Sequence, residues 1–233
     1  KAFREALAAA AATGTPLMTH HSLSTVSLDD CPGGMRRGDI YTHCYHGFES
    51  TIVDAKSRQI HPAVRAARGN GVLFDIGHGM GAFNWTVGEI CAADGFWPDI
   101  ISTDLHTGSF EGPAYDMPTV LTRMLHLGMP LPEAIRCATT APAAAIGWSD
   151  RIGTLGVGRE ADVAVLADDD ADMDLEDCQG QMRRISRRFV AKAVWRAGRT
   201  VEVTEPRCFP NERRIEEQRE NWPQLEIRDG SLD

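Results

Sequence analysis

The segment PLMTH at residues 16–20 is a short apolar run that ends in a histidine, and its plan returns three times along the chain. DIYTH (39–43) also ends in a histidine, VLFDIGHG (72–79) contains one, and DIISTD (99–104) ends in an aspartate. Short continuous apolar runs of this kind are typical of strands in a parallel sheet that is covered on both faces. The sequence therefore predicts an α/β fold with four successive parallel strands.

The connections between these four runs are long enough for one crossover helix each. The residues that end the runs are 23, 35 and 26 positions apart (20 to 43, 43 to 78, 78 to 104). Helical patterns occupy 57–68 and 84–93. An alanine-rich helical pattern over 1–12 precedes the first run, and Gly14 follows it where a helix C-cap is expected.

The second half of the chain has a different character. Helical patterns cover 117–127 and 132–145 with no strand between them. After Gly147 a small β unit is expected, with a turn-rich β segment over 151–158, strands over 161–166 and 188–195, and a return over 200–203. The polar chain from residue 204 predicts a surface-hugging or disordered tail. We therefore expect three parts, at 1–147, 148–203 and 204–233.

The composition argues against two classes of function. The 233 residues carry 24 Lys and Arg against 33 Asp and Glu, a formal net charge of −9, whereas a nucleic-acid-binding protein normally has a basic surplus. No apolar run approaches the roughly 18 residues that a membrane span needs. Six scattered cysteines without a CxxC pair are typical of reduced, buried thiols in a cytoplasmic protein. The expected partner is a small-molecule substrate, and a homo-oligomer stays open.

Imidazole and carboxylate groups stand at the ends of all four predicted strands. In a parallel sheet with helical crossovers, the carboxyl ends of the strands share one rim, where the active sites of such folds lie. His20, His43, His78 and Asp104 are therefore expected to converge. Imidazole and carboxylate together suit a divalent metal such as zinc. The spacing alone leaves open whether His20 or His21 points into the site.

These motifs resemble the amidohydrolase superfamily, and its dihydroorotase-like and deacetylase-like branch in particular. The resemblance rests on PLMTH, GDIYTHCYHG (38–47), FDIGHG (74–79) and STDLH (102–106), and then on TTAPA (139–143) with the glycine-rich and ADV elements that follow it. The motifs keep the family's order from about residue 14 to residue 203. The resemblance implies the C-terminal half of a (β/α)8 TIM barrel, strands five to eight, followed by part of a small β-sandwich domain.

The resemblance also implies a role for each residue that ends a strand. His20 and His43 would be ligands of one or two divalent ions, Zn²⁺ first of all, and Asp104 would be both a metal ligand and the general base. His78 and His106 would face the substrate. The implied reaction is the hydrolysis of an amide, cyclic amide or ester bond in a small molecule by a metal-activated water.

The sequence departs from the family pattern in two places. The family opens with a His-x-His pair, and this chain contains none. The branch also uses a carboxylated lysine on the fourth strand, whereas the three lysines here are Lys1, Lys56 and Lys192. We therefore expect these 233 residues to be the C-terminal portion of a protein that also holds the first half of the barrel. The isolated chain is then expected to be insoluble or molten and to bind metal weakly.

Two other functions fit parts of the sequence. Gly77-x-Gly79-x-x-Ala82, followed 22 residues later by Asp104, is similar to a Rossmann fingerprint and predicts an NAD-binding oxidoreductase. That pattern gives no reason for histidines to end the two preceding strands. A metal-free, non-catalytic barrel relative is the other alternative, and metal analysis separates it from an enzyme.

Several other polar residues are expected to be structural. The acidic run at 168–177 lacks the glycine and glutamate positions of a calcium loop, so a solvated loop balanced by the arginines at 183–188 is expected. His46, His61 and His126 lie in connections or helical patterns, where a histidine is more often a packed residue than a ligand.

Overall fold

The computed structural model describes residues 1–54, 56–205 and 210–221. Its first sheet is parallel, in the order β1-β2-β5, and consists of β1 (Met18–His20), β2 (Ile40–Thr42) and β5 (Leu73–Phe74). The predicted parallel succession of these three strands is confirmed.

The fourth predicted strand, over 99–103, is only an extended segment beside the third. Ile100 forms an isolated parallel bridge with Asp75, and the Gly79 N–H donates to the Thr103 carbonyl (2.8 Å). On the other side, the Ile101 N–H donates to the carbonyl of Cys137 at a helix end (2.8 Å). The segment therefore keeps its parallel course without a second strand neighbour that would make it a regular strand.

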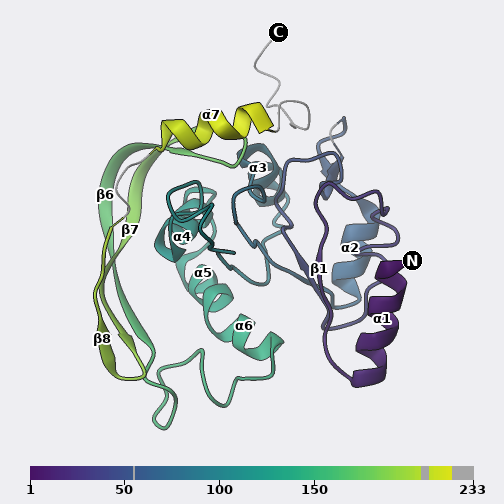
Figure 1. Ribbon diagram of the computed structural model, residues 1–233, viewed down its shortest axis with the longest axis horizontal. Helices are drawn as coiled ribbons and strands as arrows, with labels where there is room; N and C mark the ends of the chain where they lie inside the picture. Colours follow the sequence, from purple (N-terminus) through teal and green to yellow (C-terminus); the bar gives the residue numbers. More distant parts are fainter. Residues whose placement is uncertain (55, 206–209, 222–233) are drawn as a thin grey trace.

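Helices lie on either side of these strands, which makes the fold mixed α/β (Figure 1). One side carries α1 (Ala2–Thr13) and α2 (Pro62–Gly69), and the other carries α4 (Met117–His126), α5 (Leu131–Ala138) and α6 (Thr140–Ala145). The remaining helix of this part, α3 (Trp85–Ala93), follows the glycine-rich motif.

The helix ends follow local chemistry. Gly14 ends α1 in the left-handed conformation (φ 67°), as predicted. The helix expected from residue 57 begins later, because β3 (Val53–Asp54) and β4 (Gln59–Ile60) form a hairpin. The helix expected over 132–145 is divided into α5 and α6 near Thr139, and Pro142 has no N–H for a helical bond to the preceding turn.

The acidic run is part of a strand, so the expectation of a solvated loop is wrong. A second sheet is antiparallel, with β6 (Val163–Glu176) paired to β7 (Met182–Arg196) and β7 to β8 (Arg199–Val201). Basic side chains face the acids across the ladder, in the pairs Asp168–Arg187, Asp169–Lys192 and Asp172–Arg184. Opposite charges on facing strands favour this pairing, and the predicted balance by arginines is confirmed. The turn-rich segment at 151–158 contains turns and no strand.

The polar tail contains a helix, α7 (Glu212–Asn221), which lies across one end of the molecule (Figure 1). Its Ile215 and Gln218 are buried, and Gln218 Nε2 donates to the Met80 carbonyl (2.6 Å). The surface-hugging alternative is thus confirmed for this helix, while 206–209 and 222–233 lie outside the described residues.

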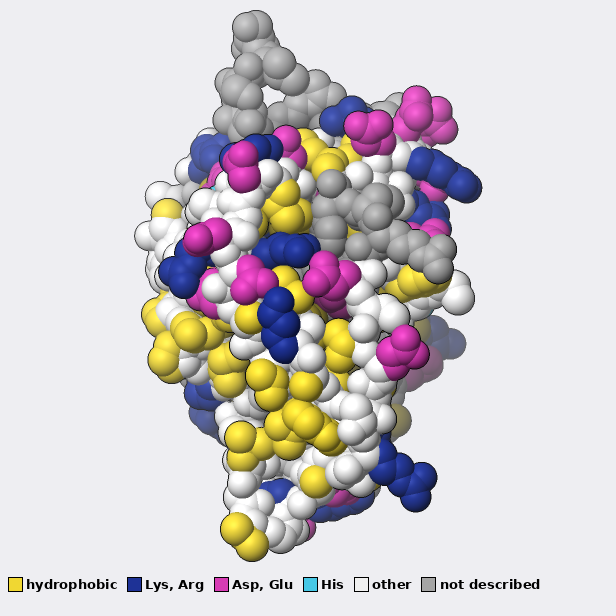
Figure 2. All heavy atoms as spheres, turned by 90° about the vertical axis from the view of Figure 1, so that its left-hand side faces the viewer, with side chains coloured by type: hydrophobic (Ala, Val, Ile, Leu, Met, Phe, Trp, Pro, Cys, Tyr) yellow, Lys and Arg dark blue, Asp and Glu magenta, His cyan; other side chains and the backbone are white. Residues whose placement is uncertain are grey.

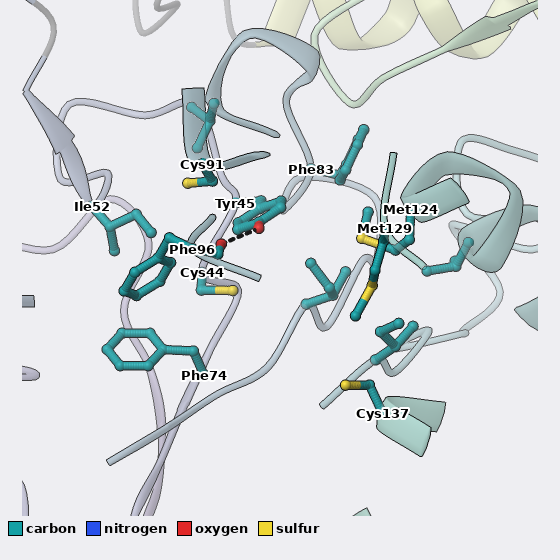
Figure 3. Packing of buried hydrophobic residues seen from close by; sticks show 14 of the residues in the cluster. Cys44, Tyr45, Ile52, Phe74, Phe83, Cys91, Phe96, Met124, Met129 and Cys137 are labelled. Atoms are coloured by element: carbon teal, nitrogen blue, oxygen red, sulfur yellow. Dashed lines mark hydrogen bonds between the residues drawn. The ribbon is translucent and has the colours of Figure 1, made fainter. Parts of the chain in front are cut away.

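The core lies between the strands and the helices and is rich in aromatic side chains (Figure 3). Tyr45, Phe74 and Phe83 are fully buried in it, and the Tyr45 hydroxyl donates to the Phe96 carbonyl (2.7 Å). A buried hydroxyl with its partner lets tyrosine serve as a core residue at little cost. The prediction of buried free thiols is confirmed for five cysteines (31, 44, 91, 137 and 178), and Cys208 lies outside the described residues.

Apolar side chains also gather on the outer face of the long hairpin (Figure 2). Val165 and Val201 are exposed on this sheet, and Leu155 and Val157 are exposed in the preceding turns. Exposed apolar surface of this kind is typical of faces that pack against another protein segment. In the part of the chain that the structure describes, no helix has the length and apolar character needed to cross a membrane.

The side chain of Asp116 caps α4, and its removal should destabilise the fold. Its Oδ1 accepts hydrogen bonds from the N–H and the hydroxyl of Thr119 (2.7 and 2.6 Å). Asp116→Ala should therefore lower the free energy of unfolding by about 1 kcal/mol in denaturant titrations. The exposed Asp150 provides the control, since Asp150→Ala should change the free energy of unfolding by less than about 0.5 kcal/mol. Equal effects of the two variants would contradict the assignment of the cap.

Candidate active site

His20 and His43 meet at the carboxyl ends of β1 and β2. The parallel register places His20 opposite Thr42, the residue before His43. His20 Nδ1 lies 3.0 Å from His43 Nε2, with the rings edge to face at a centroid distance of 4.2 Å. His21 turns away, because its ring bonds to the Tyr41 hydroxyl (2.9 Å) and to a backbone carbonyl. Of the two histidines that the spacing left open, His20 is the one that contacts His43.

The hydrogen bonds of these two rings indicate which ring nitrogens carry a proton. His43 Nδ1 lies 2.6 Å from the Gly77 carbonyl, which can only accept, so Nδ1 carries the proton and Nε2 directs a lone pair toward His20. His20 Nε2 lies 2.6 Å from the Ser22 hydroxyl. Burial, and then the neighbouring His43, lower the pKa of His20, while Asp104 opposes this shift. The His20 ring is therefore held neutral, the form in which imidazole binds metals.

The two glycines of the GHG motif make room for the neighbouring side chains. A methyl group on residue 79 would lie 2.7 Å from Asp104 Oδ2, and one on residue 77 would lie 2.8 Å from His43 Nδ1. Both glycines also have left-handed backbones (φ 48° and 49°), which side chains rarely adopt. Glycine is thus required at both positions because candidate site residues approach the backbone there.

The backbone itself is strained at two candidate site residues. His43 has φ 63° and Asp104 has φ 45°, in the left-handed region that non-glycine residues seldom occupy. Such a conformation costs of order 1–3 kcal/mol and persists where the surroundings enforce it, often at functional sites. Both strained residues therefore lie where the two parallel segments end.

The two residues expected to contact substrate lie in different surroundings. His106 is exposed two residues after Asp104, and its Nδ1 lies 2.8 Å from the Ser109 hydroxyl. His78 is fully buried and stacks on Phe83, with ring centroids 5.2 Å apart. A role of either residue in substrate binding stays a prediction, and for His78 it would require the ring to leave this packing.

Two further buried polar residues lie close to the candidate site, and neither was predicted to belong to it. His46 is fully buried, and burial followed by the nearby His21 lowers its pKa to about 3. The signal in the sequence is that His46 lies three residues after His43, just past the end of the same strand. Asp75 is fully buried as well, and its signal was a carboxylate inside an apolar run.

The side chains at this rim are of the types that bind divalent metals. A metal-binding histidine normally donates its second ring N–H to a carbonyl or a carboxylate, as His43 does to Gly77. Two imidazole nitrogens facing one another beside a carboxylate also match the ligand preference of zinc. Within the described residues, however, no three His, Cys, Asp or Glu side chains are arranged to hold a metal ion, and the two rings hydrogen-bond to each other instead.

The geometry argues against the dinucleotide alternative. A Rossmann site leaves the first N–H groups of the following helix free for the pyrophosphate. Here the Trp85 N–H donates to Asp177 Oδ2 (3.0 Å) and the Val87 N–H donates to Asn84 Oδ1 (3.0 Å). Both donors at the start of α3 are therefore occupied by side-chain oxygens of the protein.

Asp177 belongs to the tip of the long hairpin, which reaches α3 (Figure 1). Its other oxygen, Oδ1, accepts the N–H groups of Gln179 and Gln181 (2.7 and 2.9 Å). Burial outweighs these hydrogen bonds and raises the pKa of Asp177 to about 6. The hairpin tip is thus anchored at the start of α3.

Comparisons with known proteins show which sequences and structures this chain is similar to. Residues 96–202 match the model of the family described as "Amidohydrolase family". A deacetylase of Enterococcus faecalis is 35% identical over 169 residues, which are 72% of this chain and 46% of the relative. The crystal structure of an adenine deaminase superposes with a TM-score of 0.76 at 31% identity, over 80% of this chain and 51% of that one.

A dihydroorotase structure also has a TM-score of 0.76, at 28% identity over 85% of this chain and 52% of that chain. The chain therefore belongs to the amidohydrolase superfamily. It spans about half of the length of the relatives that it matches.

The buried Asp177 should make stability depend on pH. Its folded-state pKa of about 6 exceeds the ordinary value of about 3.9, so between these values the folded state binds more protons than the unfolded state. Stability should therefore fall, by up to about 3 kcal/mol, as the pH rises from about 4 to about 6. In Asp177→Asn this part of the slope should disappear from denaturant titrations, while Asp150→Asn should keep it. A slope that survives in Asp177→Asn would contradict the assignment.

Proposed function

We propose that this chain supplies the metal-binding rim of a hydrolase that cleaves an amide, cyclic amide or ester bond in a small molecule. The observation that carries the proposal is the 3.0 Å approach of His20 Nδ1 and His43 Nε2 on adjacent strand ends, with Asp104 at the same rim. Membership of a superfamily that includes a deacetylase, an adenine deaminase and a dihydroorotase among the relatives supports this reaction class.

His20, His43 and Asp104 would hold the metal, with zinc as the first choice and one or two ions in the complete site. The bound metal would polarise the substrate carbonyl and lower the pKa of a water molecule. His43 is oriented for this role through Gly77, and the hydroxyl of Ser22 orients His20. The hydrogen bond joins the two rings directly, and they would need to move apart only slightly for one ion to bind both of them.

Asp104 would perform the proton transfers. Its carboxylate is exposed and lies beside His20, so it can take a proton from the attacking water and deliver it to the leaving group. The exposed His106 is placed to contact the substrate at the same rim. The buried side of the site, with His43 and the GHG motif, would hold the geometry.

The finer architecture is also part of this proposal. We infer the second half of a (β/α)8 barrel, with the four parallel segments as its fifth to eighth strands, followed by part of a β-sandwich. The parallel course of these segments and the match to about half of each relative support it. The proposal includes a first barrel half in the same protein and a cytoplasmic location with free thiols.

Replacement of Asp104 should lower turnover without lowering the stability of the fold. In the complete protein, Asp104→Asn should lower turnover by at least about 100-fold, because the amide cannot accept the proton. A panel of N-acetyl amino acids, cyclic ureides and simple esters identifies the substrate for this assay. Thermal unfolding should stay close to that of the parent protein, and Asp150→Asn should retain full turnover. Near-normal turnover of Asp104→Asn would remove Asp104 from the mechanism.

A further inference from the structure

One buried carboxylate connects the two strand ends that carry His43 and Asp104. Asp75 is 0% exposed, and its Oδ2 accepts hydrogen bonds from the Thr42 hydroxyl (2.5 Å) and the Ser102 hydroxyl (2.9 Å). Thr42 directly precedes His43, and Ser102 lies two residues before Asp104. A single oxygen atom thus joins the segments that bear two candidate ligands.

The backbone places Asp75 between these two segments. Its N–H donates to the Tyr41 carbonyl (2.9 Å) and its carbonyl accepts the Cys44 N–H (3.0 Å) on one side. On the other side it forms the parallel bridge with Ile100. Asp75 therefore contacts both neighbouring segments and can restrain the distance between the ends that carry His43 and Asp104.

The hydroxyl bonds to Asp75 lie at the place where the regular strand pairing of β2 ends. The regular pairing of β2 ends at Thr42, and His43 and Asp104 then leave their strands with left-handed backbones. Beyond that point the backbone is joined by single hydrogen bonds, from the Cys44 N–H to the Asp75 carbonyl (3.0 Å) and from the Gly79 N–H to the Thr103 carbonyl (2.8 Å). The two hydroxyl bonds to Asp75 add a side-chain restraint that connects both segments to one residue.

Burial of the Asp75 carboxylate costs free energy, which a purely structural role would not require. Burial raises the pKa of Asp75, while the Thr42 and Ser102 hydroxyls oppose this shift. Its second oxygen, Oδ1, has no hydrogen-bond partner among the described residues. An unsatisfied buried polar atom costs about 1–3 kcal/mol, and such costs are tolerated mainly at functional sites.

We propose that Asp75 is a positioning residue, which sets the separation of His43 and Asp104 through Thr42 and Ser102 and thereby the metal affinity of the site. Asp75 itself touches neither metal nor substrate in this account. The inference rests on the proposed function, because it assigns His43 and Asp104 to the same metal site.

The test uses Co²⁺ as the probe in the complete protein, with affinity measured against a chromogenic chelator and geometry read from the visible spectrum. Asp75→Leu should weaken Co²⁺ binding by about tenfold or more, as is typical when a residue that orients metal ligands is lost. Asp75→Asn keeps an oxygen that can accept both hydroxyls, so it should remain within about threefold of the parent protein.

Two donor variants and a control complete the design. Thr42→Val and Ser102→Ala should each weaken Co²⁺ binding, and neither should add to the effect of Asp75→Leu, because both act through the same oxygen. Thr86→Val removes another hydroxyl, which bonds to Gln181 (2.9 Å), and should leave the affinity unchanged. Additive effects, or parental affinity in Asp75→Leu, would overturn the proposal. If Asp75→Leu does not fold, parental affinity in both donor variants would overturn it.

A metal-free measurement separates this inference from the proposed function. If the parent protein binds no Co²⁺, the proposed function fails, and amide hydrogen exchange of the metal-free protein then decides the role of Asp75. Asp75→Leu and Thr42→Val should both speed exchange at residues 43–44, and Asp75→Leu and Ser102→Ala at 103–106, by about tenfold relative to Thr86→Val. Unchanged exchange in these variants would exclude Asp75 as the restraint on the strand ends.

Discussion

The parallel register of β1 against β2 is the constraint on which the rest of the site depends. Met18 pairs with Ile40 and His20 with Thr42, so the ring of His20 reaches that of His43. A slip by one residue would turn the side chains to opposite faces and would present His21 instead. At the start of the strands, Asp39 helps to hold the register, since its carboxylate accepts the Leu17 N–H (2.8 Å).

The sequence was sufficient for the features that depend on neighbours along the chain. The glycine after α1 and the ends of the first two strands are local signals. The structure has Gly14 where it was expected, and β1 and β2 end at His20 and Thr42, at or next to the predicted ends 20 and 43. The convergence of His20 and His43 followed from the general rule that parallel strands end at one rim. The choice of His20 over His21 did not, because it depends on the contact of His21 with Tyr41.

Features that depend on pairing between distant segments were harder to predict. The arginines that balance the run of aspartates were expected, but the strand was not, because the run becomes a strand only through its pairing with β7, where Arg187 faces Asp168. The helix α7 is rich in charged side chains, and among its contacts are the burial of Ile215 and the hydrogen bonds of Gln218 to Met80 and of Arg219 to Gly180. The GHG motif fits two functions by pattern, and the contact that argues against the dinucleotide site, from the Trp85 N–H to Asp177, comes from a distant hairpin.

Taken together, the residues around the candidate site form two groups with different tasks. His20, Asp104 and His106 are exposed, and in the proposed site they would meet metal or substrate. His43 and Asp75 are buried, His43 as the third proposed metal ligand and Asp75 as the proposed positioning residue, and the glycines make the close approach of the chains feasible. The left-handed backbones of His43 and Asp104 lie at this same rim, as strained residues often do at functional sites.

The most direct test of the central claim is anomalous diffraction at the zinc edge from crystals of the complete, zinc-loaded protein. The account predicts a zinc peak bound by His20 Nδ1, His43 Nε2 and the Asp104 carboxylate, at the 2.0–2.2 Å typical of zinc with nitrogen and oxygen ligands. The hydrogen bond between the two rings should then be absent. Zinc bound elsewhere, with His20 still hydrogen-bonded to His43, would contradict the account.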